Sequence, residues 1–227
     1  MPSPLPRLAL LVSGRGSNLQ AILDAIAAQE LDAHIVGVFS DKPGAEALLR
    51  VDESLRWSAD AKAFANRDAF DTELADAVAA TQPDWVVCAG YMRILGDDFV
   101  QRFAGKLLNI HPSLLPKYKG LHTHRRALEA GDAEHGASVH FVVPELDAGA
   151  VIAQARIPVQ PGDTPETLAR RLLPREHALY LAVLRLAVAG RLSEQGGMAA
   201  CDAQPLFKPL SLACDGNLAV PAPVSTT

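Results

Sequence analysis

Four short runs of consecutive apolar residues mark the first half of the chain. They lie at residues 8–12, 34–39, 85–89 and 106–110. Apolar runs of this length are typical of strands buried on both faces of a parallel sheet. The segments between them, residues 17–26, 45–51 and 67–80, predict helices. Strands that alternate with helices predict an α/β fold, an open, mostly parallel twisted sheet with helices on both faces.

The pattern changes after about residue 135. Residues 138–143 and 151–157 read as strands, and the segment between them is too short for a crossover helix, which predicts an antiparallel strand pair in the C-terminal part. A long helix should follow, with Pro165 in its first turn and a kink or break at Pro174. Residues 205–213 predict a weak edge strand, and we expect the last dozen residues to be poorly ordered.

These boundaries predict one domain over residues 1–192. Its N-terminal half, about residues 8–105, would carry a candidate phosphate-binding turn, and its C-terminal half, about residues 106–192, would carry the candidate catalytic residues. Residues 193–227 would form a C-terminal extension that is partly disordered.

Composition excludes several classes of protein. Of 227 residues, 49% are hydrophobic, and 21 Lys and Arg stand against 26 Asp and Glu, a formal charge of −5. This acidic balance disfavours nucleic acid or an anionic membrane as the main partner, and no apolar run approaches the roughly 20 residues of a membrane span. Cys88, Cys201 and Cys214 are too far apart to suggest a disulfide framework or a zinc knuckle. A reduced, cytoplasmic protein is expected.

A glycine turn follows the first apolar run, in the sequence SGRGSN. Its spacing fits neither a dinucleotide fingerprint nor a nucleoside-triphosphate loop. Gly14 and Gly16 nevertheless allow a tight turn, and Ser17 with Gln20 fits a capping box that would start a helix at Ser17. The amides of Ser17 and Asn18 would then attract an anion. A monophosphate site is one hypothesis, and a turn that binds nothing is the other.

Asn109 and His111 stand where the fourth apolar run ends. In an extended strand the two side chains point to the same side, because side chains alternate with period two. Open parallel sheets bind ligands along this edge. An amide donor beside a titratable imidazole suits oxyanion stabilisation and proton transfer near neutral pH. The alternative is a histidine with a structural role only.

Asp147 lies in the connection between the two C-terminal strands. Its carboxylate either pairs with His111 or binds its own backbone in a turn, and the sequence leaves both open. The other histidines are less informative. His122 and His124 cannot share one helix face, so a metal site that includes His140 is not expected.

Eight segments together are similar to the phosphoribosylglycinamide formyltransferase family, folate-dependent enzymes of purine synthesis. In chain order they are SGRGSNLQAI (13–22), AGYMRIL (89–95), LNIHPSLLPKY (108–118), GLHTH (120–124), EHG (134–136), SVHFV (138–142), ELD (145–147) and EHA (176–178). The likeness covers about residues 8–192. The segment around Asn109 and His111 is shared by several formyl-folate enzymes, whereas the glycine loop and GLHTH are more specific to this family.

The resemblance implies a Rossmann-like formyltransferase fold and formyl transfer from the co-substrate 10-formyltetrahydrofolate to the amine of 5-phosphoribosyl-glycinamide, with no metal. It assigns oxyanion stabilisation to Asn109, the general acid to His111, and the tuning of His111 to Asp147. The ribonucleotide phosphate and glycinamide would be bound by Gly16, Ser17, Asn18 and Glu176. Folate would be bound by Arg67, Met92, Arg93, Ile94, Leu95, Asn109, Val143, Pro144, Glu145, Leu146 and Asp147. A monomer or weak homodimer is expected.

Four residues, Arg15, Lys119, Leu173 and Pro174, depart from the family pattern without removing a catalytic residue. Alternative functions are formyltetrahydrofolate hydrolysis, formyl transfer to aminoacyl-tRNA or a nucleotide sugar, and a non-catalytic binding module. The residues outside the predicted domain are too few for the regulatory domain expected of a hydrolase or for the β-barrel expected of the enzyme that acts on aminoacyl-tRNA. The glycine loop favours a ribonucleotide acceptor.

Overall fold

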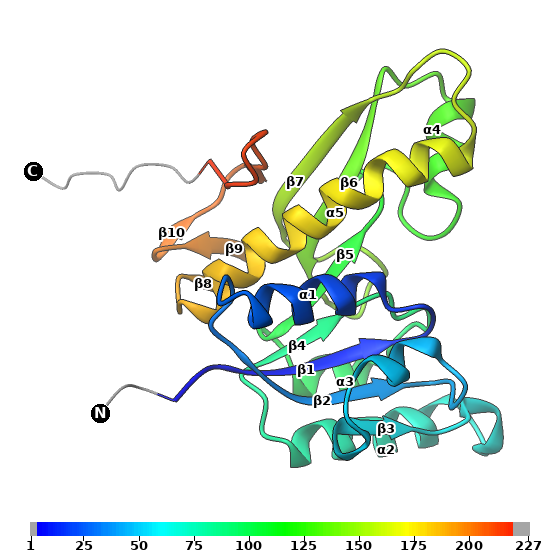
Figure 1. The fold of residues 1–227 in the computed structure, drawn as a ribbon, viewed down its shortest axis with the longest axis vertical. Coiled ribbons are helices and arrows are strands. Elements are labelled where there is room, and N and C mark those ends of the chain that lie inside the picture. Colours follow the sequence, from blue (N-terminus) through cyan, green and yellow to red (C-terminus); the bar gives the residue numbers. More distant parts are fainter. Residues whose placement is uncertain (1–3, 220–227) are drawn as a thin grey trace, which may run out of the picture. The chain divides into compact units, whose positions relative to one another are not determined.

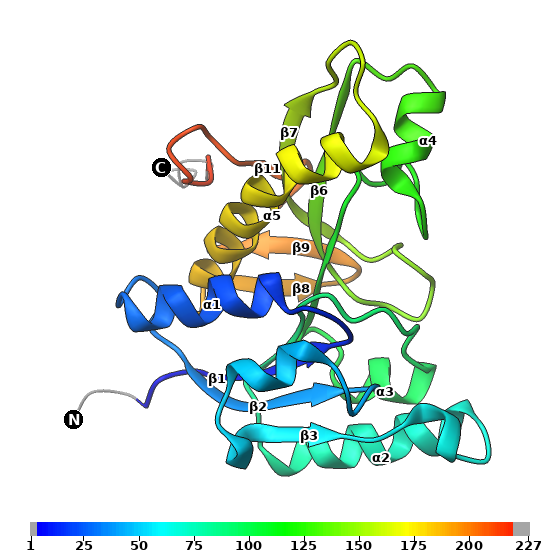
Figure 2. The ribbon, with the colours of Figure 1, turned by 45° about the vertical axis from the view of Figure 1, so that its right-hand side comes forward.

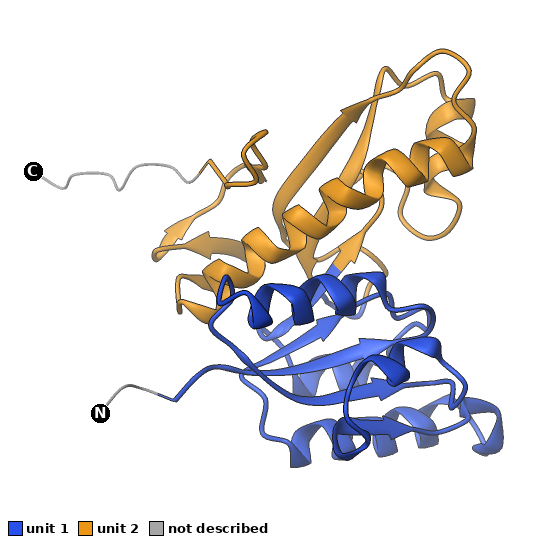
Figure 3. Ribbon diagram, in the orientation of Figure 1, with its two compact units in different colours: residues 1–109, 142–144 blue, residues 110–141, 145–227 orange. Residues whose placement is uncertain are grey.

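The chain divides into two compact units, residues 1–109 with 142–144 and residues 110–141 with 145–227 (Figure 3). The structure is a computed structural model that describes residues 4–219. Among these residues, no helix combines the length and the apolar character that crossing a bilayer demands.

The first unit is built on a parallel sheet. Its strands are β1 (Arg7–Val12), β2 (His34–Ser40), β3 (Arg56–Ser58), β4 (Trp85–Cys88) and the first part of β5 (Leu107–His111). They pair in parallel in the order β5-β4-β1-β2-β3. Residues 8–12 of β1 are fully buried, as expected for a strand covered on both faces. The predicted parallel sheet is therefore confirmed.

Helices cover this sheet on opposite sides. Helix α1 (Ser17–Ala27) lies on one side, and α2 (Arg67–Ala80) lies on the other (Figures 1 and 2). Aromatic and aliphatic side chains of α2 and of α3 (Asp97–Arg102) pack on the strands in one buried cluster, which includes Phe70, Leu74, Val78, Phe99 and Phe103. Three short 3-10 helices complete the unit, η1 (Glu46–Arg50), η2 (Glu53–Leu55) and η3 (Ala61–Ala63).

One local prediction in this unit is confirmed and another is wrong. The predicted helix over residues 45–51 is present as the 3-10 helix η1. Helix α1 does begin at Ser17, but its N-cap is Gly16 and no side chain caps it. The predicted capping box is absent because Ser17 is already helical, and the Gln20 side chain instead bonds Asp24 and Arg50.

The second unit contains the antiparallel pair predicted from the sequence. Strand β6 (Glu134–Phe141) pairs with β7 (Val151–Pro158), and β11 (Leu210–Ser211) adds to β7 in parallel, inside the segment expected to give an edge strand. Helix α5 (Pro165–Val188) packs on both long strands, and α4 (Thr123–Glu129) contacts α5 (Figure 1).

Side chains cap the N-terminus of helix α5. Thr164 and Thr167 form a reciprocal capping box, and Pro165 occupies the first turn. The helix continues through Pro174 without being divided, so the predicted break is absent, and the alternative, a kink, stays a prediction. Packing of its apolar face on β6 and β7 outweighs the hydrogen bond that proline cannot donate.

A small antiparallel sheet follows α5 and was missed in the sequence. It consists of β8 (Leu192–Gln195), β9 (Met198–Cys201) and β10 (Gln204–Pro205). Leu212 then pairs with Leu218. Of the last dozen residues, for which disorder was predicted, residues 220–227 lie outside the described part of the chain.

Candidate active site

The glycine turn of the first unit is held by η1. Gly16 has φ 75°, and a Cβ there would come within 2.6 Å of the Ala47 Cβ, so only glycine fits. The Ala47 amide donates to the carbonyl of Gly14 at 3.0 Å, and Nε of Arg50 donates to the carbonyl of Arg15 at 2.8 Å. The turn is therefore fixed before any ligand binds.

The start of α1 has the features of an anion site. The first amides of a helix have no partner within the helix, and α1 has no side-chain cap. Ser17 and Asn18 occupy these positions. The side-chain oxygen Oδ1 of Asn18 is buried without a hydrogen-bond partner among residues 4–219. Arg15, exposed in the middle of the turn, adds positive charge.

A serine links this turn to the segment after β4. Ser13 is buried, and its Oγ donates to Oδ1 of Asp41 at 2.6 Å and accepts from the Met92 amide at 2.9 Å. The predicted phosphate loop and the predicted folate segment 92–95 are thus joined inside the first unit. Sequence reasoning missed Ser13 and Asp41, because nothing in their spacing signals this contact.

The folate residues assigned to the first unit gather near Arg67. Its Nη2 donates to the carbonyl of Leu95 at 2.7 Å, and its Nε donates to Asp71 at 3.3 Å. Arg93 lies 3.7 Å from the other oxygen of Asp71. Met92 and Ile94 are exposed. Val143 and Pro144 also belong to this unit.

His111 and Asp147 come together in the second unit. Nδ1 of His111 lies 3.4 Å from Oδ2 of Asp147, and each side chain is less than a tenth exposed. Asp147 has φ 48° in the turn after β6, and Oδ2 accepts the Gly120 amide at 2.9 Å. The carboxylate is therefore turned toward His111 and Gly120. Asn109 lies two residues before His111 on β5 and is partly buried.

The two ring nitrogens of His111 both face acceptors. Nε2 lies 2.9 Å from the carbonyl oxygen of Tyr118, which can only accept, so Nε2 carries a proton. Nδ1 faces the Asp147 carboxylate. Only the protonated ring can donate on both sides at once. Donation from Nε2 to a substrate therefore requires exchange of the bond to Tyr118.

A second imidazole, that of His140, shares Asp147. Its Nε2 lies 3.7 Å from Oδ1 of Asp147, and its Nδ1 donates to the carbonyl of Phe141 at 2.7 Å. Burial lowers the pKa of His140. Sequence reasoning considered His140 only as a metal ligand. Its signal was its position on the strand that leads to Asp147.

The loop around Tyr118 is tied down by charged side chains. Asp132 accepts from Lys117 and from the Tyr118 hydroxyl, both at 2.8 Å. Lys119, one of the departures from the family pattern, pairs with Glu145 at 2.9 Å. Glu145 and Leu146, both predicted folate residues, are exposed beside this loop. The Tyr118 carbonyl is held at His111 by these contacts.

His124 and His135 form a separate pair in the second unit. Nδ1 of His124 lies 2.9 Å from Nε2 of His135. Burial, and then the neighbouring ring, lowers the pKa of His135 to about 4, and burial also lowers the pKa of His124. Within residues 4–219, no three His, Cys, Asp or Glu side chains gather as metal ligands would.

Glu176 lies on α5 and is partly buried. Burial raises its pKa to about 7. The next residue, His177, has a pKa lowered by burial, and its Nε2 has no hydrogen-bond partner in the described chain. A buried carboxyl group that titrates near neutral pH is a functional-site candidate in its own right.

Comparisons with known proteins agree on one family. Residues 6–184 match the family model described as formyl transferase. The chain is 48% identical over 201 residues to the phosphoribosylglycinamide formyltransferase of Escherichia coli (strain K12). The aligned region covers 88% of this chain and 95% of that relative. The structure of a phosphoribosylglycinamide formyltransferase from Coxiella burnetii superposes with a TM-score of 0.83 at 42% identity, over 88% of this chain and 95% of that one. The structure of a formyltetrahydrofolate deformylase from Pseudomonas syringae pv. tomato superposes with a TM-score of 0.79 at 27% identity, over 88% of this chain and 66% of that one.

Proposed function

The chain belongs to the formyl transferase family, and we propose that it transfers the formyl group of 10-formyltetrahydrofolate to the amine of 5-phosphoribosyl-glycinamide, a step of purine synthesis. The extent of the likeness to the Escherichia coli enzyme carries this proposal. The pairing of His111 with Asp147, and the fixed glycine turn, support it independently.

In the proposed reaction the substrate amine attacks the formyl carbon directly. A bond forms between that carbon and the amine nitrogen, and the carbonyl electrons move to oxygen. Asn109 donates a hydrogen bond to this oxygen, and loss of one such donor costs roughly 10²–10³ in kcat. Strand β5 carries both Asn109 and the proposed acid, which supports this role.

Collapse of the tetrahedral species breaks the bond to the folate nitrogen. That nitrogen leaves as an amine only if it receives a proton, and His111 supplies the proton in the proposed mechanism. The Asp147 carboxylate at Nδ1 compensates the positive charge of the ring and fixes its orientation. The attacking nitrogen loses one proton to water and His111 regains one from water, so atoms and charge balance without a covalent bond to the enzyme.

Binding of the acceptor is assigned to two places. The amides of Gly16, Ser17 and Asn18 would hold the ribose phosphate, because a helix N-terminus with free amides favours an anion. Glu176 would contact the glycinamide, and its raised pKa leaves it partly ionised near pH 7. As an acceptor it could then take a hydrogen bond from a substrate N–H group.

The donor site is assigned to the predicted folate residues. Arg67, Arg93 and the exposed Met92 are among the residues proposed to contact the donor. Glu145 and Leu146, both exposed, have the same proposed role. Folate would be a co-substrate that leaves after each turnover, not a resident cofactor.

Assembly and location are part of the same proposal. We expect a monomer or a weak homodimer, with small molecules as its partners and neither nucleic acid nor membrane among them. A cytoplasmic location fits Cys88, Cys201 and Cys214, none of which forms a disulfide within the described chain, because disulfides are rare in that compartment.

Hydrolysis of 10-formyltetrahydrofolate is the second candidate, favoured by the likeness to the deformylase structure. The deciding experiment measures consumption of 10-formyltetrahydrofolate by the full chain with and without 5-phosphoribosyl-glycinamide. The transferase proposal expects turnover only with the acceptor, and formylated acceptor in equal amount to the donor consumed. Equal rates in both mixtures, with formate as product, would overturn it.

A further inference from the structure

Asp71 is a buried carboxylate that sequence reasoning did not single out. It lies on α2 and is 4% exposed. Its Oδ2 accepts hydrogen bonds from the Gly96 amide at 2.8 Å and from Nε of Arg67 at 3.3 Å. Its Oδ1 lies 3.7 Å from Nε of Arg93. One carboxylate thus contacts both arginines assigned to the formyl donor. It also holds the loop that ends at Gly96, directly before α3.

Each of these arginines is held on one side and open on the other. Arg67 also donates to the Leu95 carbonyl, and its side chain is 46% exposed. The Arg93 guanidinium lies 4.9 Å from the ring centroid of Phe70. Nε of Arg93 is buried toward Asp71 and has no hydrogen-bond partner among residues 4–219, whereas the Arg93 side chain as a whole is 26% exposed. Both groups therefore retain donors for a ligand while their positions are restrained.

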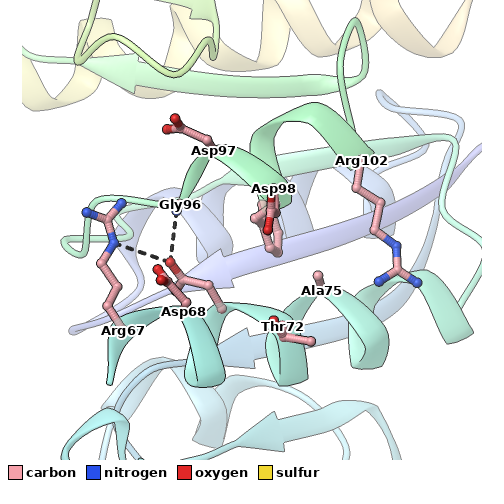
Figure 4. Close-up of a pocket in the computed structure, with 10 residues that line it drawn as sticks. Arg67, Asp68, Thr72, Ala75, Gly96, Asp97, Asp98 and Arg102 are labelled. Atoms are coloured by element: carbon pink, nitrogen blue, oxygen red, sulfur yellow. Dashed lines mark hydrogen bonds and ion pairs between the residues drawn. The ribbon is translucent and has the colours of Figure 1, made fainter. Parts of the chain in front are cut away.

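The two guanidinium groups beside Asp71 can bind an anionic ligand only if they stay where they are, because acidic side chains lie nearby. The groove between α2 and α3, about 510 Å³ in volume, is lined by the exposed acids Asp68, Asp97 and Asp98 (Figure 4). A free arginine would pair with such acids. Contact with buried Asp71 keeps both guanidinium groups oriented and lowers the entropy lost on binding.

We propose that Asp71 is a positioning residue for the formyl donor, which holds Arg67 and Arg93 ready for the carboxylates of the donor's glutamate. The proposal rests on the proposed function, because that function supplies the donor. 10-formyltetrahydrofolate ends in a glutamate with two carboxylates, and guanidinium groups bind carboxylates in a paired geometry. Asp71 itself touches no reacting atom. Its effect should be confined to the tail of the donor.

The test compares ligands with and without the glutamate. In the Asp71→Asn variant, which preserves shape and can still accept from Gly96, we expect the Kd of tetrahydrofolate to rise about tenfold. The Kd of tetrahydropteroate, which lacks the tail, should stay unchanged. KM for 10-formyltetrahydrofolate should rise in parallel, while kcat and KM for 5-phosphoribosyl-glycinamide stay at their wild-type values.

Asp76→Asn is the matched control. Asp76 lies on the same helix, is exposed and pairs with Arg102 at 2.5 Å rather than with Arg67 or Arg93. This variant should bind both ligands like the wild type. If Asp71→Asn does not fold, Asp71→Ser gives the same readout, because a smaller neutral side chain cannot hold either guanidinium.

Three outcomes overturn the proposal. They are an unchanged Kd for tetrahydrofolate, an equal loss for both ligands, and a rise in the acceptor's KM that matches the donor's. The last two would mean that Asp71 only supports the fold. The binding measurements need no turnover, so they test Asp71 separately from the proposed function. A wild type that binds tetrahydrofolate but shows no acceptor-dependent activity would contradict the proposed function. The Kd comparison would still decide whether Asp71 positions the two arginines.

Discussion

Nδ1 of His111 lies 3.4 Å from Oδ2 of Asp147 although 36 residues separate them in the chain. The turn between β6 and β7 brings them together, because Asp147 adopts φ 48° there and its Oδ2 also accepts the Gly120 amide. Such a conformation costs energy in a non-glycine residue and persists only when surrounding contacts fix it. The carboxylate is thus built into the position that the proposed acid requires.

Replacing Asp147 by asparagine should slow the chemical step. The amide keeps the size of the side chain but removes the charge that compensates a protonated His111, so we expect kcat to fall by about 10²-fold. KM for both substrates should change little. Steady-state kinetics at pH 7.5 measures both quantities, and thermal unfolding checks that the variant is folded. A kcat close to that of the wild type would show that Asp147 does not act on His111.

Removing the Asn109 amide tests the proposed oxyanion contact. The variant Asn109→Ala should lose about 10²–10³ in kcat, the usual cost of one such donor. Binding of both substrates should be nearly normal, because the interaction forms only as charge develops on oxygen. The measurement is single-turnover formyl transfer. If only KM changes, Asn109 binds the ground state and does not stabilise the transition state.

The glycine turn offers a matched pair of substitutions. At Gly16 a methyl group would meet Ala47 within 2.6 Å and would have to adopt φ 75°, whereas at Gly14 nothing lies within 4 Å. Gly16→Ala should destabilise the protein by about 1–3 kcal/mol and weaken binding of 5-phosphoribosyl-glycinamide. Gly14→Ala should do neither. Urea unfolding and acceptor Kd decide the matter, and equal effects of the two substitutions would contradict the proposed role of the fixed turn.

Much of the fold was predictable because buried strands leave a local signal. The apolar runs at β1, β2, β4 and β5 need no long-range information, and neither does the short connection that makes β6 and β7 antiparallel. The hairpin β8–β9 also had a signal that was not used. Gly196 and Gly197 both have positive φ, which is the turn that glycine pairs favour between two strands.

The candidate site was less predictable because its contacts are long-range. Ser13, Asp41 and Asp71 are ordinary polar residues in the sequence, and only the packed structure shows that each holds a loop or an arginine. The capping box failed for a related reason. Gly16 ends the turn in the left-handed region because η1 packs against it, and that contact shifts the cap from Ser17 to Gly16.

Stability at mildly acidic pH should depend on the His124–His135 pair. The folded pKa of His135 is about 4, below the value of about 6.5 expected in the unfolded chain. The unfolded state therefore binds the proton first, and stability present above pH 6.5 is lost as the pH falls toward 4, by up to about 3 kcal/mol. The ring–ring hydrogen bond also needs one ring to accept, which a protonated pair cannot do.

Urea unfolding between pH 7.5 and 5 measures this effect. The variant His135→Gln should have lower stability at neutral pH but should lose less of it on acidification than the wild type. His34→Gln makes the same chemical change on an exposed side chain and should follow the wild type. Parallel pH dependences of wild type and His135→Gln would contradict the assignment.

Glu176 should act on stability with the opposite sign. Its folded pKa of about 7 lies above the unfolded value of about 4.5, so the folded state holds the proton more tightly. The contribution of Glu176 to stability is fully present below pH 4.5 and decreases as the pH rises to 7, by up to about 3 kcal/mol. The variant Glu176→Gln cannot ionise and should therefore gain stability relative to the wild type between pH 5 and pH 8.

This prediction separates a buried carboxyl group from a solvated one. The difference in unfolding free energy between Glu176→Gln and the wild type is measured at pH 5, 6.5 and 8, which cancels the histidine contribution common to both proteins. Acceptor binding gives a second readout, because an ionised Glu176 would accept a hydrogen bond from a substrate N–H group. The affinity for 5-phosphoribosyl-glycinamide should therefore rise with pH near 7 in the wild type. In the variant it should not change with pH. If the difference in unfolding free energy between the variant and the wild type does not change with pH, Glu176 is ionised over the whole range from pH 5 to pH 8. Glu176 would then contact the substrate as a permanently charged carboxylate.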